Sequence, residues 1–158
     1  MASEHRAQEL SDLLARVEGA TGRLSDDDVG RLVCAALGEK FGSAEIQCGD
    51  SGADELGIYN CFDRQVWSDY RQDAPDASVD AAIALVERTL PGWRWVVRRA
   101  YPEDDGRPLH VSYVEQVDGE NFGAIAPTPA LAILAALLRA LLHDARDGAS
   151  QQKATDHG

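Results

Sequence analysis

The sequence is poor in basic residues and lacks long apolar runs. Lys and Arg total 15 against 27 Asp and Glu, which gives a formal net charge of -12. So acidic a surface repels phosphate, which argues against direct nucleic-acid binding and against anionic membranes. No apolar run approaches the length that crosses a bilayer, and residues 1–16 lack the apolar core of a signal peptide. We therefore expect a cytoplasmic protein that does not bind membranes.

Motifs for catalysis or metal binding are also missing. The three cysteines and four histidines form no C-x-x-C or H-E-x-x-H pattern. A zinc site from Cys48, Cys61 and His110 lacks the usual ligand spacing, and Cys61 with His110 is the sole candidate pair of nucleophile and base. We therefore expect no catalytic residues, no metal and no cofactor. Whether Cys48 and Cys61 pair stays open, although a reducing cytoplasm favours free thiols.

The length of 158 residues and the hydrophobic fraction of 44% fit one ordinary globular domain. Apolar residues at helical spacing predict helices over 3–18, 78–90 and 128–146, and a further helix that begins at 25 and ends at Gly38 or Gly42. Ser25, Ser78 and Thr128 are predicted N-caps. Residues 43–75 are the weakest stretch, with one short strand expected at 58–62 and with Trp67 and Tyr70 as anchors to the core.

Residues 93–117 alternate as an antiparallel hairpin, and 122–126 are expected to add a third strand. Trp93, Trp95 and Val97 are predicted to face the core, while Arg94 and Arg98 face away. On the second strand, the residues predicted to face the core are Leu109, Val111 and Tyr113. These elements predict the α+β class, with about four helices and a small, mainly antiparallel sheet. We expect an N-terminal helical pair over 1–42, an α/β core over 43–146 that forms one compact domain with it, and a disordered tail over 147–158.

Residues 78–142 resemble a known group of proteins. The pattern is S-V-D-A-A-I-A-L-V-E, then L-P-G-W-R-W, then a polar hairpin, then T-P-A-L-A-I-L-A-A-L-L-R-A. It is similar to small uncharacterised phage and prophage proteins of the phage ABA-sandwich type. The resemblance implies a layered α/β/α sandwich, an origin in a phage or prophage and hence a bacterial host cell. It implies no activity, and residues 1–75 lie outside it.

Three functions follow as hypotheses. In the first, a non-enzymatic phage accessory protein binds a basic surface on a host protein, as an inhibitor of host defence would, and its acidic runs mimic phosphates. That acidic interaction surface is predicted at Asp26, Asp27, Asp28, Glu103, Asp104 and Asp105. In the second, the protein binds a nucleotide-like small molecule through Arg94, Arg98, Trp67 and Tyr113. The third is a role in assembly of the phage particle.

Two of these features have structural explanations as well. Acidic residues at 26–28 also suit the first turn of a helix, where they complement the helix dipole. Arg94 and Arg98 can pair with the protein's own carboxylates. The oligomeric state is not predicted by the sequence.

Overall fold

A computed structural model describes residues 2–48, 52–100 and 109–156. Four α-helices, six strands and one 3₁₀ turn follow one another in these ranges. In chain order they are α1 (Ala2–Gly19), α2 (Asp26–Leu37), β1 (Phe41–Cys48), β2 (Asp54–Asn60), β3 (Gln65–Tyr70), η1 (Arg71–Asp73), α3 (Val79–Thr89), β4 (Arg94–Ala100), β5 (Leu109–Glu115), β6 (Asn121–Ala126) and α4 (Pro129–Asp156).

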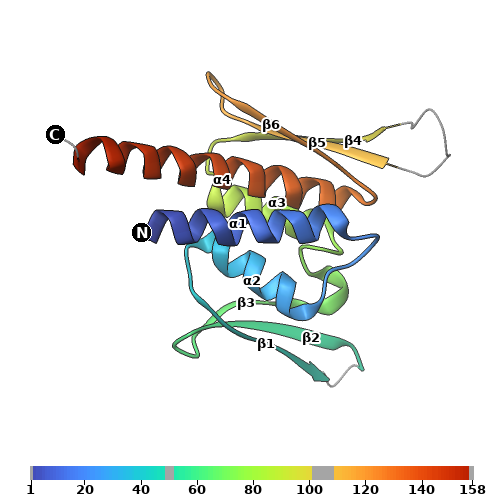
Figure 1. The fold of residues 1–158 in the computed structure, drawn as a ribbon. Coiled ribbons are helices and arrows are strands. Elements are labelled where there is room, and N and C mark those ends of the chain that lie inside the picture. The colour runs from blue at the N-terminus through green and yellow to red at the C-terminus, as the bar shows by residue number, and fades with distance from the viewer. Residues whose placement is uncertain (1, 49–51, 101–108, 157–158) are drawn as a thin grey trace.

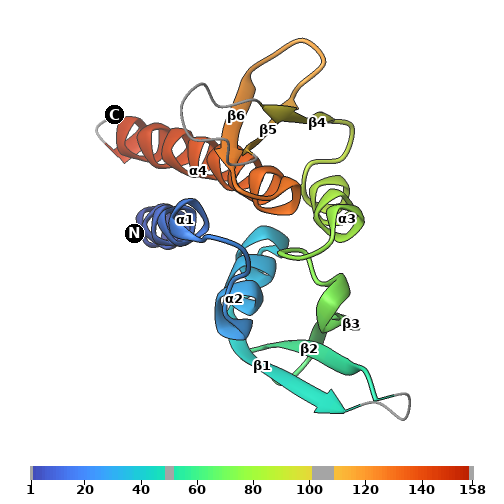
Figure 2. The same cartoon turned by 90° about the vertical axis from the view of Figure 1, so that its right-hand side faces the viewer.

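The helices lie between two antiparallel sheets (Figures 1 and 2). The first sheet has the order β1-β2-β3 and packs against α2, while the second has the order β4-β5-β6 and packs against α4. Helices α1 and α3 join the two halves through their contacts with α4 and α2. The α+β sandwich with four helices and antiparallel strands is therefore confirmed. Its strands are divided between two sheets on the outside, whereas a single sheet inside α/β/α layers was expected.

Helix α4 forms the centre of the core. Every residue from Ala130 to Leu138 is buried, because one side of the helix packs on the second sheet and another on α1 and α3. A helix that is apolar all round is typical of such a fully covered position. The alanines at 132, 135, 136 and 140 allow close approach of the neighbouring elements.

The predicted helix starts are confirmed. The side chain of Ser25 accepts a hydrogen bond from the Asp28 amide at 3.1 Å, and Ser78 does the same for the Ala81 amide at 3.3 Å. Thr128 Oγ1 accepts from the Leu131 amide at 3.2 Å. Gly38 ends α2 in the left-handed conformation with φ 74°, which a residue without a side chain adopts most readily.

The first sheet occupies the stretch that the sequence predicted least well. Strands β1, β2 and β3 replace the single short strand expected at 58–62, and Phe62 lies in the β2–β3 turn rather than in a strand. Leu56 and Ile58 point toward α2 and are fully buried. Trp67 packs against the same core as expected, whereas Tyr70 is 40% exposed and anchors nothing inside.

In the second sheet the hairpin and the third strand are confirmed, but one face assignment was wrong. Trp95 pairs with Val114 and Val97 pairs with Ser112, so Ser112 and Val114 share the core-facing side of the sheet and are fully buried. Leu109, Val111 and Tyr113 therefore lie on the outer face. Apolar residues of β5 lie on both faces of the sheet. The alternation therefore predicted a strand correctly but did not show which of its faces packs on the core.

The C-terminal segment also differs from the prediction, which placed a disordered tail over 147–158. Helix α4 continues to Asp156 and does not stop near Arg146. Lys153 pairs with Glu4 at 2.8 Å, and Ser3 donates a hydrogen bond to Gln152 at 3.3 Å, so α1 lies along this last part of α4. The end of α4 was expected to be disordered because it is polar, but one neighbouring helix supports it.

Candidate functional site

The acidic residues at the start of α2 are largely neutralised by arginines. Asp26 accepts a hydrogen bond from Arg71 Nε at 2.7 Å, and Asp28 pairs with Arg16 of α1. Only Asp27 is exposed and has no ion-pair partner among the described residues. The other half of the predicted acidic surface, Glu103, Asp104 and Asp105, lies outside the described residues.

Arg71 belongs to a buried structural network. Its guanidinium binds both carboxylate oxygens of Asp76 and the carbonyl oxygen of Leu24, and Asp76 also accepts from the Leu24 amide at 2.9 Å. Burial opposes the charge on Arg71, but the hydrogen bonds to Asp76 and Asp26 outweigh it and hold the pKa of Arg71 above its ordinary value. These contacts fasten the α1–α2 connection to the segment before α3.

An acidic surface does exist on the outer face of the first sheet. We define this acidic face by the outward residues Ser43, Glu45, Gln47, Glu55, Gly57, Tyr59, Ser68 and Tyr70. Glu45 pairs with Gly57 and Gln47 with Glu55, so the two glutamates are diagonal neighbours on adjacent strands. Both are exposed and neither has an ion-pair partner in the described part of the chain.

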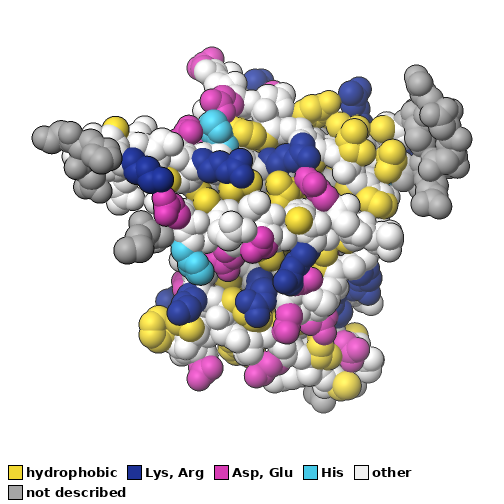
Figure 3. All heavy atoms as spheres, in the orientation of Figure 1, with side chains coloured by type: hydrophobic (Ala, Val, Ile, Leu, Met, Phe, Trp, Pro, Cys, Tyr) yellow, Lys and Arg dark blue, Asp and Glu magenta, His cyan; other side chains and the backbone are white. Residues whose placement is uncertain are grey.

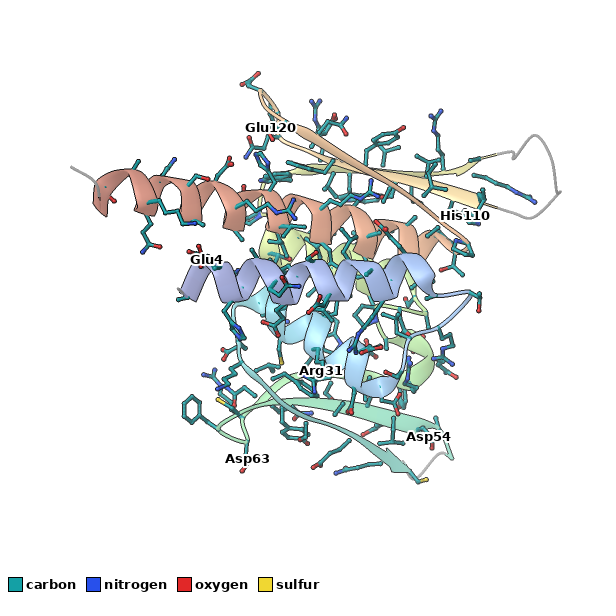
Figure 4. All side chains as sticks on the ribbon, viewed as in Figure 1. Glu4, Arg31, Asp54, Asp63, His110 and Glu120 are labelled. Atoms are coloured by element: carbon teal, nitrogen blue, oxygen red, sulfur yellow. The ribbon has the colours of Figure 1, made fainter. Side chains whose placement is uncertain are left out.

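The surroundings of the acidic face reinforce its charge. No Lys or Arg occurs from residue 41 to residue 63. Asp54 and Asp63 lie at opposite ends of the same sheet (Figure 4), and acidic side chains gather along the lower edge of the molecule in Figure 3. The Tyr59 ring lies beside Gly57, where an added Cβ would come within 2.9 Å of it. The acidic face thus combines carboxylates with aromatic surface.

Three of the four residues of the predicted small-molecule site share one surface. Arg94 and Arg98 lie on β4, and Tyr113 lies on β5 opposite Val96, all on the outer face of the second sheet. Trp67 belongs to the first sheet, on the other side of the helices, where the Arg88 guanidinium lies 5.5 Å from the centre of its ring. The structure therefore does not assemble this four-residue site.

The outer face of the second sheet is mainly apolar. We define this apolar face by its outward residues Arg94, Val96, Arg98, Leu109, Val111, Tyr113, Glu115, Asn121, Gly123 and Ile125. Val96 is 46% exposed and Ile125 is 58% exposed. Three of the four charged and polar members, Arg94, Glu115 and Asn121, form one end row, with Arg94 Nε and Glu115 Oε1 3.3 Å apart; the fourth, Arg98, pairs with Val111 further along β4. Figure 3 shows hydrophobic side chains clustered over β4 and β5.

A polar groove of about 530 Å³ separates α1 from α2. It is lined by both signs of charge, including Glu9, Asp27, Arg16 and Arg31, and the Arg31 guanidinium lies 4.8 Å from the centre of the Phe41 ring. Four carboxylates (Glu9, Asp12, Asp27 and Asp28) stand against two arginines in its lining, and one of the four, Asp28, is already paired with Arg16.

The histidines and cysteines do not converge. His143 lies 2.8 Å from Glu120 and 3.1 Å from Asp147, and its ring packs against Phe122. Cys48 and Cys61 are at opposite ends of β1 and β2, and His110 is in the second sheet, so neither the zinc site nor the pair of Cys61 and His110 is assembled. Within residues 2–48, 52–100 and 109–156, no group of three potential ligands is placed to hold a metal ion.

No protein-family model matches the chain, and no curated protein matches it. The resemblance of residues 78–142 to phage proteins therefore stays a prediction. Across the described ranges, no helix is long and apolar enough to cross a membrane.

The acidic face was missed by the sequence analysis. The predicted acidic surface consisted of the consecutive acidic residues at 26–28 and 103–105. Glu45 and Glu55 are ten residues apart in sequence and become neighbours only through strand pairing. One signal was present in the sequence, namely the absence of Lys and Arg over 41–63.

Proposed function

We propose that this chain is a non-enzymatic accessory protein, of phage or prophage origin, that binds a basic surface of a host macromolecule. Its binding element is the acidic face of the first sheet. The observation that carries the proposal is the pair of exposed, unpaired carboxylates of Glu45 and Glu55 on a surface without Lys or Arg.

The contrast with Asp26 and Asp28 supports the choice of surface. Those two carboxylates are already bound by Arg71 and Arg16, so a partner's arginine would have to displace an internal one. Glu45 and Glu55 need no such exchange. Tyr70, which pairs with Glu55 across β2 and β3, adds exposed aromatic surface of the kind that is enriched in protein interfaces.

A flat strand face also suits this role. The side chains of Glu45 and Glu55 project from adjacent hydrogen-bonded strands, so their spacing is held by the sheet. Charges held in this way attract an opposite surface and set the orientation of encounter, and their effect falls as salt screens it. The partner is therefore a protein with a basic patch, such as a nucleic-acid channel.

The test is an affinity capture from bacterial lysate with mass spectrometry of the retained proteins. The bait is the tagged full chain, at low and at high salt. We expect a retained basic protein that elutes as salt rises and that is lost from the variant Glu45→Gln/Glu55→Gln. The matched control is Glu87→Gln/Asp144→Asn, which removes the same charge from exposed carboxylates on α3 and α4.

Two outcomes contradict the proposal. One is a partner that both double variants retain equally, because the acidic face would then be irrelevant. The other is loss of the partner with both variants, which would indicate an effect of net charge without any specific surface. If an oligonucleotide displaces the captured protein, the basic patch of that protein is a nucleic-acid-binding site.

A further inference from the structure

Two arginines without ion-pair partners line one hollow beside the first sheet. The hollow has a volume of about 270 Å³ and lies between the end of α2, the start of β3 and the last turn of α3. It is lined by Leu37, Glu39, Arg64, Gln65, Val66 and Arg88. Asp and Glu outnumber Lys and Arg by 27 to 15 in the whole chain, yet no described carboxylate pairs with Arg64 or with Arg88.

Arg64 is held by the tight turn between β2 and β3. The buried side chain of Asn60 accepts hydrogen bonds from the amides of Phe62 and Arg64, both at 3.0 Å. The Asn60 amide in turn donates to the Arg64 carbonyl oxygen at 2.9 Å. Asp63, which is labelled at this end of the sheet in Figure 4, adopts the left-handed conformation in the same turn, with φ 60°. The backbone of Arg64 is therefore fixed at both its amide and its carbonyl, beside the hollow that its side chain lines.

Arg88 is held by the ring of Trp67. Its guanidinium lies 5.5 Å from the centre of that ring, and an aromatic face attracts a cation at such a distance. The register of β3 shifts at Val66, so the consecutive residues Val66 and Trp67 both pack against the core. The two arginines of the hollow are thus positioned by separate contacts, one by a turn and the other by an aromatic ring.

The carboxylate that lines the hollow, that of Glu39, has another role. Its Oε2 accepts a hydrogen bond from Asn60 Nδ2 at 3.2 Å, so Glu39 supports the same turn that carries Arg64. Two arginines against one carboxylate leave the lining of the hollow with a positive charge. Lys40 adds a further exposed cation at this end of the sheet, because its carbonyl oxygen accepts from the Cys61 amide at 2.8 Å.

Each arginine has a simpler explanation when it is considered by itself. Arg88 stands in the last turn of α3, where a cation complements the helix dipole. Arg64 belongs to an exposed turn, where a charged side chain is solvated. Neither explanation requires that arginines from two elements line the same hollow, or that their exposed sequence neighbours Asp63 and Glu87 leave them unpaired. The groove between α1 and α2 differs, since its carboxylates outnumber its arginines.

We propose that this hollow binds the phosphate group of a small molecule through hydrogen bonds from the guanidinium groups of Arg64 and Arg88. The planar donors of an arginine bind two phosphate oxygens at once, and such charge-assisted bonds are about twice as strong as neutral ones. A phosphate monoester carries about -1.5 to -2 charges at pH 7, which two arginines match. A carboxylate carries a single charge on two oxygens and would satisfy only one of them.

The size of the hollow limits which phosphate compounds it takes. A volume of about 270 Å³ is just below the ~300 to 1,000 Å³ of pockets that enclose drug-sized ligands. The hollow therefore holds the phosphate group and leaves the rest of a larger molecule in solvent. A nucleic-acid backbone is repelled along its length by the acidic surface of the chain. A single small anion is affected mainly by nearby charges, because salt screens those beyond about 8 Å at physiological ionic strength.

The experiment is isothermal titration calorimetry of the full chain with inorganic phosphate, adenosine monophosphate and acetate, all at one ionic strength. We expect saturable binding of the two phosphate compounds at one site per chain, and binding of acetate that is about tenfold weaker or less. Equal affinity for the two phosphate compounds would identify the phosphate group alone as the recognised feature. Tighter binding of adenosine monophosphate would identify a phosphate ester as the ligand, because its nucleoside would then add contacts.

Variants of the two arginines test the position of the site. Arg64→Gln and Arg88→Gln are each expected to weaken phosphate binding about tenfold or more, the loss that follows removal of one charged hydrogen-bond donor. Arg88→Lys keeps the charge without the two-pronged donor and should retain part of the affinity. The matched control is Arg31→Gln, which removes an exposed arginine that also lies over an aromatic ring but lines the groove between α1 and α2. This control should bind phosphate as the wild type does.

Three results would overturn the proposal. They are a folded wild type that binds neither phosphate compound, acetate that binds as tightly as inorganic phosphate, and losses of affinity in Arg31→Gln as large as those in Arg64→Gln and Arg88→Gln. Circular dichroism verifies that each variant is folded. The capture experiment changes only Glu45 and Glu55, which do not line this hollow, so failure of phosphate binding leaves the test of the acidic face unaffected.

Discussion

The guanidinium of Arg71 binds both oxygens of the buried Asp76 carboxylate, at 2.7 and 3.0 Å. The Asp76 side chain is fully buried, so its charge depends on this one arginine and on the Leu24 amide. Arg71 and Asp76 are only five residues apart, but both also bind the backbone of Leu24, so the pair fastens the α1–α2 connection to the segment that follows β3.

Replacing Asp76 should therefore destabilise the protein strongly. Asp76→Asn leaves Arg71 partly buried without its main counter-ion, and we expect a loss of about 3 kcal/mol or more in the free energy of unfolding. Urea denaturation followed by circular dichroism measures it. The control is Asp144→Asn, an exposed carboxylate on α4, which should change stability by less than about 0.5 kcal/mol. Equal stability of the two variants would show that the network is dispensable.

The three cysteines should differ sharply in reactivity. Burial raises the pKa of the Cys34 thiol from 9.0 to about 11, whereas Cys48 and Cys61 are exposed. At pH 8 we expect a disulfide reagent such as DTNB to modify two thiols in the folded protein and three in urea. Modification of Cys34 in the native state at the rate of the other two would contradict its burial.

The same thiol predicts a dependence of stability on pH. The folded state keeps Cys34 protonated up to about pH 11, while the unfolded chain loses this proton near pH 9, so the unfolded state binds fewer protons in between. Stability contributed by the neutral thiol is present below pH 9 and declines as the pH rises from 9 toward 11. We expect the free energy of unfolding to fall more steeply over this range in the wild type than in Cys34→Ala. Parallel curves would show that Cys34 does not titrate differently in the two states.

The end of α4 should contribute little to stability. Residues 149–155 are helical but mostly exposed, and their polar contacts with α1 are the ion pair of Lys153 with Glu4 and the hydrogen bond that Gln152 accepts from Ser3. Removing residues 149–158 should lower the helical circular dichroism signal while leaving the melting temperature almost unchanged, since exposed ion pairs stabilise weakly. A large drop in melting temperature would mean that this segment supports the core. Truncation before Leu138 should unfold the protein, because it removes the buried Leu138, Leu141 and Leu142.

The helices were predictable because their signals are local. Ser25, Ser78 and Thr128 each bond to an amide three residues ahead, and both the cap and the apolar stripe can be read within a dozen residues. The last turns of α4 were missed because their support comes from α1, which is more than a hundred residues away in sequence.

The first sheet was not predictable in the same way. On β2 only Leu56 and Ile58 mark the inner face, while Gly57 between them resembles a strand breaker. Gly57 is needed because the Tyr59 ring fills the space above it, a contact that no local pattern reveals. The candidate site suffers from the same limit, since Glu45 and Glu55 become one surface only when β1 and β2 pair.

A pair of glycine substitutions should have opposite effects. A Cβ at Gly123 would lie 2.8 Å from the Tyr113 ring, so the ring must move off the sheet. We expect Gly123→Ala to cost about 1 to 3 kcal/mol of stability, as overpacking does. In contrast, a Cβ at Gly148 on α4 meets nothing within 4 Å, and Gly148→Ala should stabilise by about 0.5 to 1 kcal/mol through helix propensity.

Urea titrations of both variants measure this difference, and tyrosine fluorescence and near-ultraviolet circular dichroism report whether the Tyr113 ring has moved. If Gly123→Ala were as stable as the wild type and kept the wild-type aromatic signal, the Tyr113 ring would not rest on Gly123. The packing of Tyr113 against Gly123 on the outer face of the second sheet would then differ from the one described.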